Sequence, residues 1–176
     1  GTYTYDGSPK VPAAADITVE DGTTTIPAGE YTVTFRDNVE AGTATAVITN
    51  ANGGNYIVNG TATFEIAKAA ASATAPNGLE NLPYNGTAQV LVTAGASDDG
   101  TVVYSVNGGN YSAAIPTASA VGTYTIDWKV LGDDNHSDTA PETLTPDVEI
   151  AKNTVTSPTI SLSQDTFQYN GSQQKP

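Results

Sequence analysis

The chain has 176 residues and carries 19 acidic against 6 basic side chains, a formal net charge of −13. Without a basic stripe to replace counterions on phosphates, it disfavours nucleic acid and anionic membrane surfaces as partners. The lack of cysteine excludes disulfides, cysteine-based zinc sites and thiol catalysis. Because no window approaches the ~18 apolar residues that a membrane helix needs, no membrane insertion is predicted.

One short motif occurs three times along the chain. A tyrosine is followed by Asn or Asp and then Gly at Tyr5, Tyr84 and Tyr169, so the tyrosines lie 79 and 85 residues apart. Asn and Asp tolerate positive φ and Gly adopts it at no steric cost, so each copy predicts a tight turn anchored by its aromatic ring. The spacing is too long for a solenoid unit and suits a small domain.

The motif spacing divides the chain into three parts. We predict one domain over residues 1–68, with a short leading strand, and a second over 69–152. Residues 153–176 then form a linker and the first strand of a truncated third repeat. The first residue is not Met, so we expect the chain to belong to a longer array.

Strand-like alternation appears at several places in the first part. Residues 30–36 place Tyr31, Val33 and Phe35 on one face and polar side chains on the other, which predicts a half-buried strand. Further strands are predicted at residues 43–49 and 61–66, the latter with Ala62, Phe64 and Ile66 inward, and shorter ones at 17–19 and 23–26.

The second part follows the same pattern. Strands are predicted at residues 89–92, 101–106, 122–130 and 146–151, with the inward set of the second being Val102, Tyr104 and Val106. Asn107 and Gly108 begin a strong hairpin signal. The run at 122–130 is the longest alternating one, and we take Trp128 as its core anchor.

No apolar stripe of helical period persists over ten residues. The alanines at 69–71 have helix propensity, but Ser, Thr and Pro follow at once, so we read residues 69–78 as a linker. Short strands separated by frequent turns favour an all-β fold of two tandem β-sandwich domains. The unpaired opening strand at 158–170 predicts strand exchange, in cis or in trans, with the first domain, whose own leading strand is short.

Several motifs together resemble a known family. They are the Tyr-Asx-Gly turn, Gly42-Thr43 or Gly122-Thr123, the loops at 54–56 and 133–136, and a closing Ile-Ala-Lys at 66–68 and 150–152. This set is similar to bacterial immunoglobulin-like repeats of the MBG-like type, which occur in tandem on cell-surface and adhesin-like proteins. The resemblance implies immunoglobulin-like sandwiches that serve as a stalk or spacer, with no shared catalytic residues.

The loop at 133–138 holds the weak site candidates. Asp133, Asn135, Ser137 and Asp138 are hard oxygen donors at alternating spacing, so they form a calcium candidate, although the EF-hand pattern is absent. His136 is the only histidine, and we interpret it as a solvated turn residue rather than a base or ligand. Neither a catalytic residue nor a cofactor is predicted.

Exposed aromatic side chains suggest the alternative function. Tyr56 and Tyr111 are candidates for stacking on a sugar or a protein partner, and Tyr3 also lacks an obvious inward position. We predict a non-enzymatic extracellular structural repeat of a bacterial cell-surface or adhesin-like protein, whose partners are neighbouring repeats of the same chain. The alternative is a carbohydrate- or protein-binding adhesin module that contacts a host glycan or protein through the loops at 50–60, 107–118 and 132–142.

Overall fold

The computed structural model describes residues 2–163 and 165–175, and it is built almost entirely of β-strands. Its helical elements in this part of the chain are two 3-10 turns, η1 (Ala14–Asp16) and η2 (Ala28–Glu30). No helix among the described residues is long and apolar enough to cross a bilayer. The prediction of an all-β fold is confirmed, because alternating side chains and Gly-containing turns leave no helical stripe to bury.

The strands fall into two groups, since each pairing in the described part of the chain joins strands of the same group. The first strand group comprises β1 (Tyr3–Thr4), β2 (Glu20–Asp21), β3 (Thr24–Thr25), β4 (Tyr31–Arg36), β5 (Gly42–Asn50) and β6 (Gly60–Ala67). Four of these strands form one sheet in the order β1-β6-β5-β4, and β2 pairs with β3 as a small hairpin.

The second strand group contains the remaining strands. They are β7 (Ala69–Ala70), β8 (Asn77–Gly78), β9 (Leu82–Pro83), β10 (Gln89–Val90), β11 (Val92–Thr93), β12 (Gly100–Val106), β13 (Thr117–Ala118), β14 (Gly122–Tyr124), β15 (Ile126–Gly132), β16 (His136–Ser137), β17 (Glu142–Thr143) and β18 (Val148–Ala151). They form two three-stranded sheets, β12-β15-β17 and β14-β18-β9, and three separate two-stranded pairs, β10-β13, β11-β8 and β16-β7.

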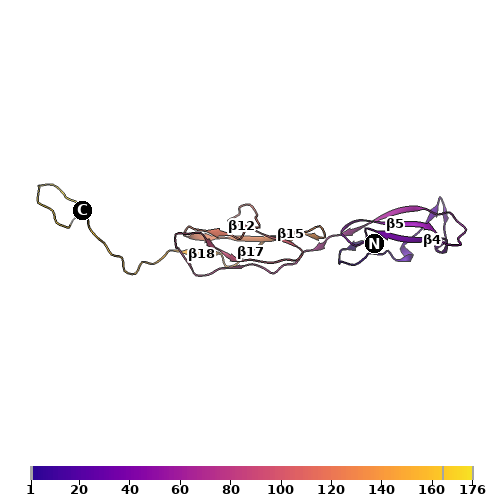
Figure 1. Cartoon of the computed structure of the whole chain (residues 1–176), viewed down its shortest axis with the longest axis horizontal. Coiled ribbons are helices and arrows are strands. Elements are labelled where there is room, and N and C mark those ends of the chain that lie inside the picture. Colours follow the sequence, from indigo (N-terminus) through magenta and orange to yellow (C-terminus); the bar gives the residue numbers. More distant parts are fainter. Residues whose placement is uncertain (1, 164, 176) are drawn as a thin grey trace.

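The molecule is elongated. The two strand groups lie end to end along its long axis, and the segment after β18 extends beyond the second group (Figure 1). The structure assigns no strand to residues 153–163 or 165–175, so the exchange predicted for 158–170 is not found within the chain. Exchange between two copies stays a prediction.

The second strand group has a closed apolar core. Eight buried side chains form one cluster that draws on both three-stranded sheets: Leu91, Val92, Tyr104, Ile126, Trp128, Val130, Val148 and Ile150. Trp128 is 6 % exposed, which confirms it as a core anchor. Burial of such large side chains is the main term that stabilises a fold of this size.

The core of the first strand group is less covered. Tyr31, Val33 and Phe35 share the inner face of β4 as predicted, yet all three are only half-buried. Phe35 and Tyr3 pack edge-to-face on Phe64, with ring centroids 6.1 and 5.4 Å from it. Ala62 was expected inside and is exposed, because nothing in the described part of the chain covers that end of the face.

Both strand groups share one closing arrangement. The short strand before each Tyr-Asx-Gly turn runs parallel to the last strand of its group, with Tyr3 opposite Ile66 and Leu82 opposite Ile150. In both groups the tyrosine N–H then donates to the alanine after that isoleucine, Tyr5 to Ala67 at 2.9 Å and Tyr84 to Ala151 at 2.8 Å. The same backbone geometry is therefore built twice.

The three predicted turns are present. In each one the Asx Oδ1 accepts a backbone N–H from the residue two positions on, at 2.9 Å for Asp6, 2.9 Å for Asn85 and 3.0 Å for Asn170. The glycine between them has φ near +80° in all three, a conformation that glycine adopts without a steric penalty. The third turn forms although no strand surrounds it, so the motif is locally encoded.

Some predicted strands differ from the structure. The strand expected at 17–19 lies at Glu20–Asp21, and residues 89–92 and 122–130 are each split into two strands that pair with different partners. The split occurs because the chain crosses from one sheet to the other at Leu91 and at Thr125. At the centre of β12 Val103 and Ser105 are buried together with Tyr104. The segment after the Asn107 turn returns along the edge of β12, where Ser112 pairs with Tyr104 and the carbonyl of Gly109 accepts the Ser105 hydroxyl at 2.8 Å.

Residues 69–78 are not a free linker, which corrects the sequence interpretation. Ala69–Ala70 pairs in parallel with His136–Ser137, Thr74 forms a bridge with Ala96, and β8 pairs with β11. This segment therefore acts as a leading strand of the second strand group, which pairs first with β16 and then with residues 92–96. Its alanines favour helix in isolation, but tertiary pairing overrides that weak preference.

Candidate functional site

The loop between β15 and β16 is where the two strand groups meet. Asp133 shapes the loop, because its Oδ1 accepts the backbone N–H groups of Asn135 at 2.8 Å and His136 at 2.9 Å. This is the local side-chain to backbone bonding that makes Asp frequent in turns. The loop thereby projects the side chains of residues 135 and 136 towards the first strand group.

Asn135 makes the direct contact across the junction. Its Oδ1 accepts the backbone N–H of Ala41 at 2.9 Å, and its Nδ2 donates to the Glu40 carboxylate. Both partners lie just before β5 of the first strand group. A single amide thus uses its donor and its acceptor on the same short segment, which fixes its orientation.

His136 fills the centre of the junction. Its side chain is only 15 % exposed and lies between two carboxylates, with Nδ1 2.8 Å from Asp133 and Nε2 3.5 Å from Asp99. The ring of Tyr5 packs edge-on against the imidazole, at 5.4 Å between centroids and 87° between planes. The interpretation of His136 as a solvated turn residue was wrong, because the first strand group covers it.

The covalent connection between the groups is fastened to the same loop. Lys68 separates β6 from β7, and its Nζ donates to the carbonyl of Asp133 at 2.7 Å. The next residue, Ala69, donates its N–H to the carbonyl of Asn135 at 2.9 Å and accepts the Ser137 hydroxyl at 3.0 Å. Three hydrogen bonds thus hold the connecting residues to the loop.

Two carboxyl groups at the junction are held in their ionised form. The hydrogen bond from the His136 side chain, helped by the N–H of Asn135, lowers the pKa of Asp133 below its ordinary value. The side-chain and backbone hydrogen bonds from Ser72 lower the pKa of Asp99 in the same way. Hydrogen bonds to the charged form are the cause in both cases.

The four oxygen donors of the calcium candidate do not converge on one point. Asp133 bonds its own loop, Asn135 reaches the first strand group, and Ser137 bonds Ala69. Asp138 accepts the N–H of Gly132 at 3.0 Å and lies 3.4 Å from Lys129. The described residues include no group of three or more His, Cys, Asp or Glu side chains placed to hold a metal ion.

Tyr56 and Tyr111 also lie apart. Tyr56 follows β5 in the first strand group and is 43 % exposed, whereas Tyr111 belongs to the second group and is 38 % exposed. The Lys129 ammonium lies 5.4 Å from the centroid of the Tyr111 ring, which is within cation–π range. The two rings do not form a shared stacking platform.

The loops proposed as one contact surface are separated as well. β5 starts beside the junction at Gly42 and ends at Asn50, so the loop that follows lies roughly 25 Å away at the strand rise of about 3.3 Å per residue. The loop at 132–142 contacts the first strand group at the junction. Asn107, which begins the loop at 107–118, lies beside Thr125 at the other end of β15. Any ligand contact would use one of these loops alone.

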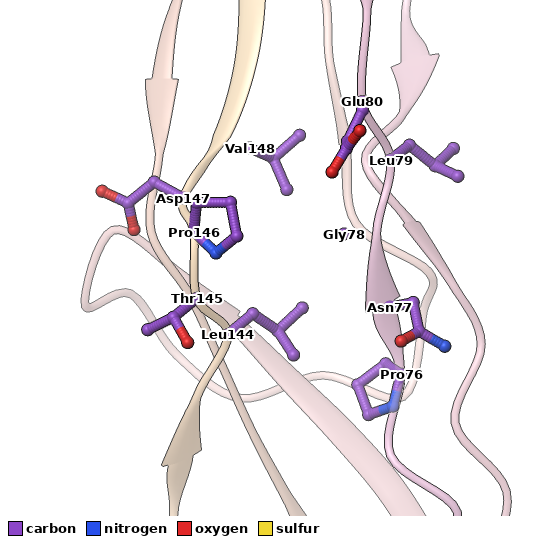
Figure 2. Close-up of a pocket in the computed structure, with 10 residues that line it drawn as sticks. All are labelled: Pro76, Asn77, Gly78, Leu79, Glu80, Leu144, Thr145, Pro146, Asp147 and Val148. Atoms are coloured by element: carbon purple, nitrogen blue, oxygen red, sulfur yellow. The ribbon is translucent and has the colours of Figure 1, made fainter.

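A shallow hollow lies between the leading strand and the segment before β18. It is lined by residues 76–80 and 144–148 (Figure 2). The Glu80 carboxylate points towards the space between the two segments, while the Asp147 carboxylate points away from it (Figure 2). A Cβ at Gly78 would lie 3.0 Å from the Val148 Cγ2 atom, so any larger residue would crowd this side chain. The lining offers one inward carboxylate and no second group placed to share a proton with it.

Comparisons with protein-family models, with curated proteins and with solved structures found no match. The resemblance to bacterial immunoglobulin-like repeats therefore remains a prediction from the sequence motifs.

Proposed function

We propose that the chain is a non-enzymatic extracellular spacer, a stalk segment of a bacterial cell-surface or adhesin-like protein. In this proposal residues 1–68 and 69–152 are tandem immunoglobulin-like β-sandwich domains, and residues 153–176 open a third repeat. The repeated closing arrangement at Tyr5 and Tyr84 supports the division into like units. The junction built on Asn135 and His136 supports the mechanical role most strongly, because a spacer has to resist bending between its units.

The acidic surface suits this role. The formal charge of −13 is spread over both strand groups, so neighbouring copies repel one another and the array stays dispersed and soluble.

Distance measurements between spin labels test the stiffness of the junction. The chain has no cysteine, so Thr32→Cys and Glu142→Cys provide one exposed label on each strand group. We expect a narrow distance distribution in the parent chain and a broader one after Asn135→Ala, because that change removes both hydrogen bonds to residues 40 and 41. Asn110→Ala, in an exposed loop, is the matched control. A broad distance distribution in the unaltered chain would contradict the proposed spacer function.

The alternative of a carbohydrate- or protein-binding adhesin module has one observation in its favour. Tyr56 and Ile57 are adjacent and exposed, at 43 % and 91 %, in the loop at the outer end of the first strand group. An aromatic ring beside an aliphatic side chain is a usual contact for a sugar face or a protein hot spot. A glycan array with the parent chain and Tyr56→Ala would support this function by a dose-dependent signal that the variant loses.

A further inference from the structure

The strand β4 stands at the edge of its sheet, and its outer side is open. The sheet order β1-β6-β5-β4 gives β4 a single neighbour, β5. Within the described part of the chain, β4 is the one edge strand longer than three residues whose outer side has no backbone partner. It also lacks the usual protection of such an edge, since its six residues include no proline and no lysine.

The antiparallel pattern determines which backbone groups of β4 face outward. The Ala51 N–H donates to the Glu30 carbonyl at 3.1 Å, so Glu30 and every second residue after it bond to β5. The N–H and carbonyl groups of Tyr31, Val33 and Phe35 therefore point away from β5. These are the residues of β4 whose side chains are half-buried.

The second strand group covers the same edge. Val33 of β4 pairs with Ile48, which lies six residues after the glycine of the Gly-Thr motif. Tyr104 of β12 pairs with Trp128, at the same distance from its own Gly-Thr motif, so Val33 and Tyr104 are counterparts. Tyr104 exchanges two backbone hydrogen bonds with Ser112, at 2.8 and 2.9 Å. Val33 has no such outer partner among the described residues.

The difference between the two edges comes from an internal connection. Between β12 and β14 the chain has fifteen residues, 107–121, and part of this connection returns along the edge of β12. Between β4 and β5 it has only five, 37–41. Residues 69–79 pair with β16 and with residues 91–96, so they take no part in covering β12.

We propose that β4 pairs with β4 of a second copy of the chain, antiparallel and centred on Val33. In this register Val33 lies opposite Val33 of the other copy, and Tyr31 lies opposite Phe35. The outward-facing residues of the two copies then meet one another, which gives about six backbone hydrogen bonds across a two-fold axis. A shift by one residue would set outward groups against groups already bonded to β5.

The side chains match in this register. Tyr31 opposite Phe35, and valine opposite valine, continue the apolar inner face of the sheet from one copy to the other. On the exposed face Thr32 lies opposite Thr34, a favourable cross-strand pair. The same strand is therefore complementary to itself on both faces.

Charge also favours a second copy as the occupant. In the same register Arg36 comes opposite Glu30 at both ends of the pair. Arg36 is exposed and takes part in none of the ion pairs found among the described residues. Each Glu30 carboxylate oxygen accepts one hydrogen bond from Asn55 and can accept another. Residues 31–35 carry no charge, so the acidic repulsion between copies is not concentrated at this edge.

Size exclusion coupled to light scattering tests the pairing on the whole chain, in about 150 mM salt to screen the acidic surfaces. We expect a mass that rises with concentration and stops at the dimer, because the pair uses both β4 edges. Thr32→Lys with Thr34→Lys sets like charges opposite each other and should weaken the dimer at least about 10-fold. Thr61→Lys with Thr63→Lys adds the same charge at exposed positions of β6 and is the matched control, which should still dimerise.

Opposite charges should restore the pair. Thr32→Glu with Thr34→Glu should also weaken the dimer, for the same reason as the lysine variant. An equimolar mixture of the two double variants should form a heterodimer, because residue 32 of one copy lies opposite residue 34 of the other. A mixture that stays monomeric while the control dimerises would overturn the register.

Amide hydrogen exchange identifies the edge. As the concentration rises, the amides of Tyr31, Val33 and Phe35 should exchange at least about 10-fold more slowly, whereas those of Thr32 and Thr34, already bonded to β5, should change less. A dimer that leaves the Val33 amide unprotected would overturn the proposal.

Three further outcomes would also overturn it. They are a parent chain that stays monomeric up to millimolar concentration, growth beyond the dimer, and protection of Val33 only when a foreign extended peptide is added. The proposal does not rest on the spacer function, because lateral pairing and the stiffness of the junction are measured separately.

Discussion

In the second strand group residues 74–79 pair with 91–96 and bury Pro76, whereas the counterpart residues 12–17 of the first group meet no strand among the described residues. The consequence is visible in the cores. The second group buries a cluster of eight apolar side chains, while the buried apolar residues described in the first group are Ile26, Ala44, Val58 and Ile66. In the second group the pairing of residues 74–79 thus accompanies a closed core.

The largest expected effect is on the stability of the second core. Trp128→Ala should destabilise it by about 3–5 kcal/mol, because the substitution leaves a large cavity in a closed cluster. Phe35→Ala in the first group should cost only about 1–2 kcal/mol, since less of that side chain is removed from water. Urea denaturation followed for each group measures both values, and Trp128→Phe should recover part of the loss. Equal losses of stability at the two positions would contradict the difference between the two cores.

A smaller effect is expected from acid at the junction. The folded-state pKa values of Asp133 and Asp99 lie below the ordinary value of 3.8, so the stabilisation from their charged forms is complete above about pH 4. It is lost as the pH falls through the lower folded-state values. We therefore expect the spin-label distance distribution to broaden below about pH 4.

Substitution identifies the group responsible for this acid response. Asp133→Asn weakens the contact to His136 at neutral pH, so it should broaden the distribution already at pH 7 and flatten the acid response. Asp134→Asn, an exposed acid in the same loop, is the control. An acid response that is identical in the parent chain and in Asp133→Asn would show that the junction is held by other groups.

The smallest expected effect is on the free energy of unfolding, and it distinguishes the turn at Asn85 from the turn at Asn170. Asn85→Ala removes the Oδ1 acceptor of the Thr87 N–H and hydroxyl, both at 2.9 Å, and should cost about 0.5–1.5 kcal/mol. Asn170→Ala removes the equivalent bond to Ser172 in a segment without strands, so the free energy of unfolding should not change. Thermal melts of the two variants measure the difference. A destabilised Asn170→Ala chain would mean that the third turn is part of a folded unit.

The features predictable from sequence are the local ones. Alternation along residues 31–36 and 122–130 identified the strands and Trp128 because a sheet with one buried face imposes period 2. The Asx-Gly turns were predictable because their hydrogen bonds lie within three residues. Both the alternation and the turn motif can therefore be recognised from a few consecutive residues.

The features that were missed depend on distant partners. Ser105 gave no sign of burial, because the segment that covers it comes from residues 107–116. His136 resembled a solvated loop residue, since its burial depends on Tyr5 and on the approach of the other strand group. Residues 69–78 lack alternation, and their strand character comes from pairing with β16 and β11.

Native-state hydrogen exchange on the whole chain tests the central comparison most directly. If the leading strand determines how well each core is closed, amides in β12 and β15 should exchange at least about 100-fold more slowly than those in β5 and β6, which corresponds to about 2.7 kcal/mol. Equal protection of the two sheets, or stronger protection of β5 and β6, would contradict the account.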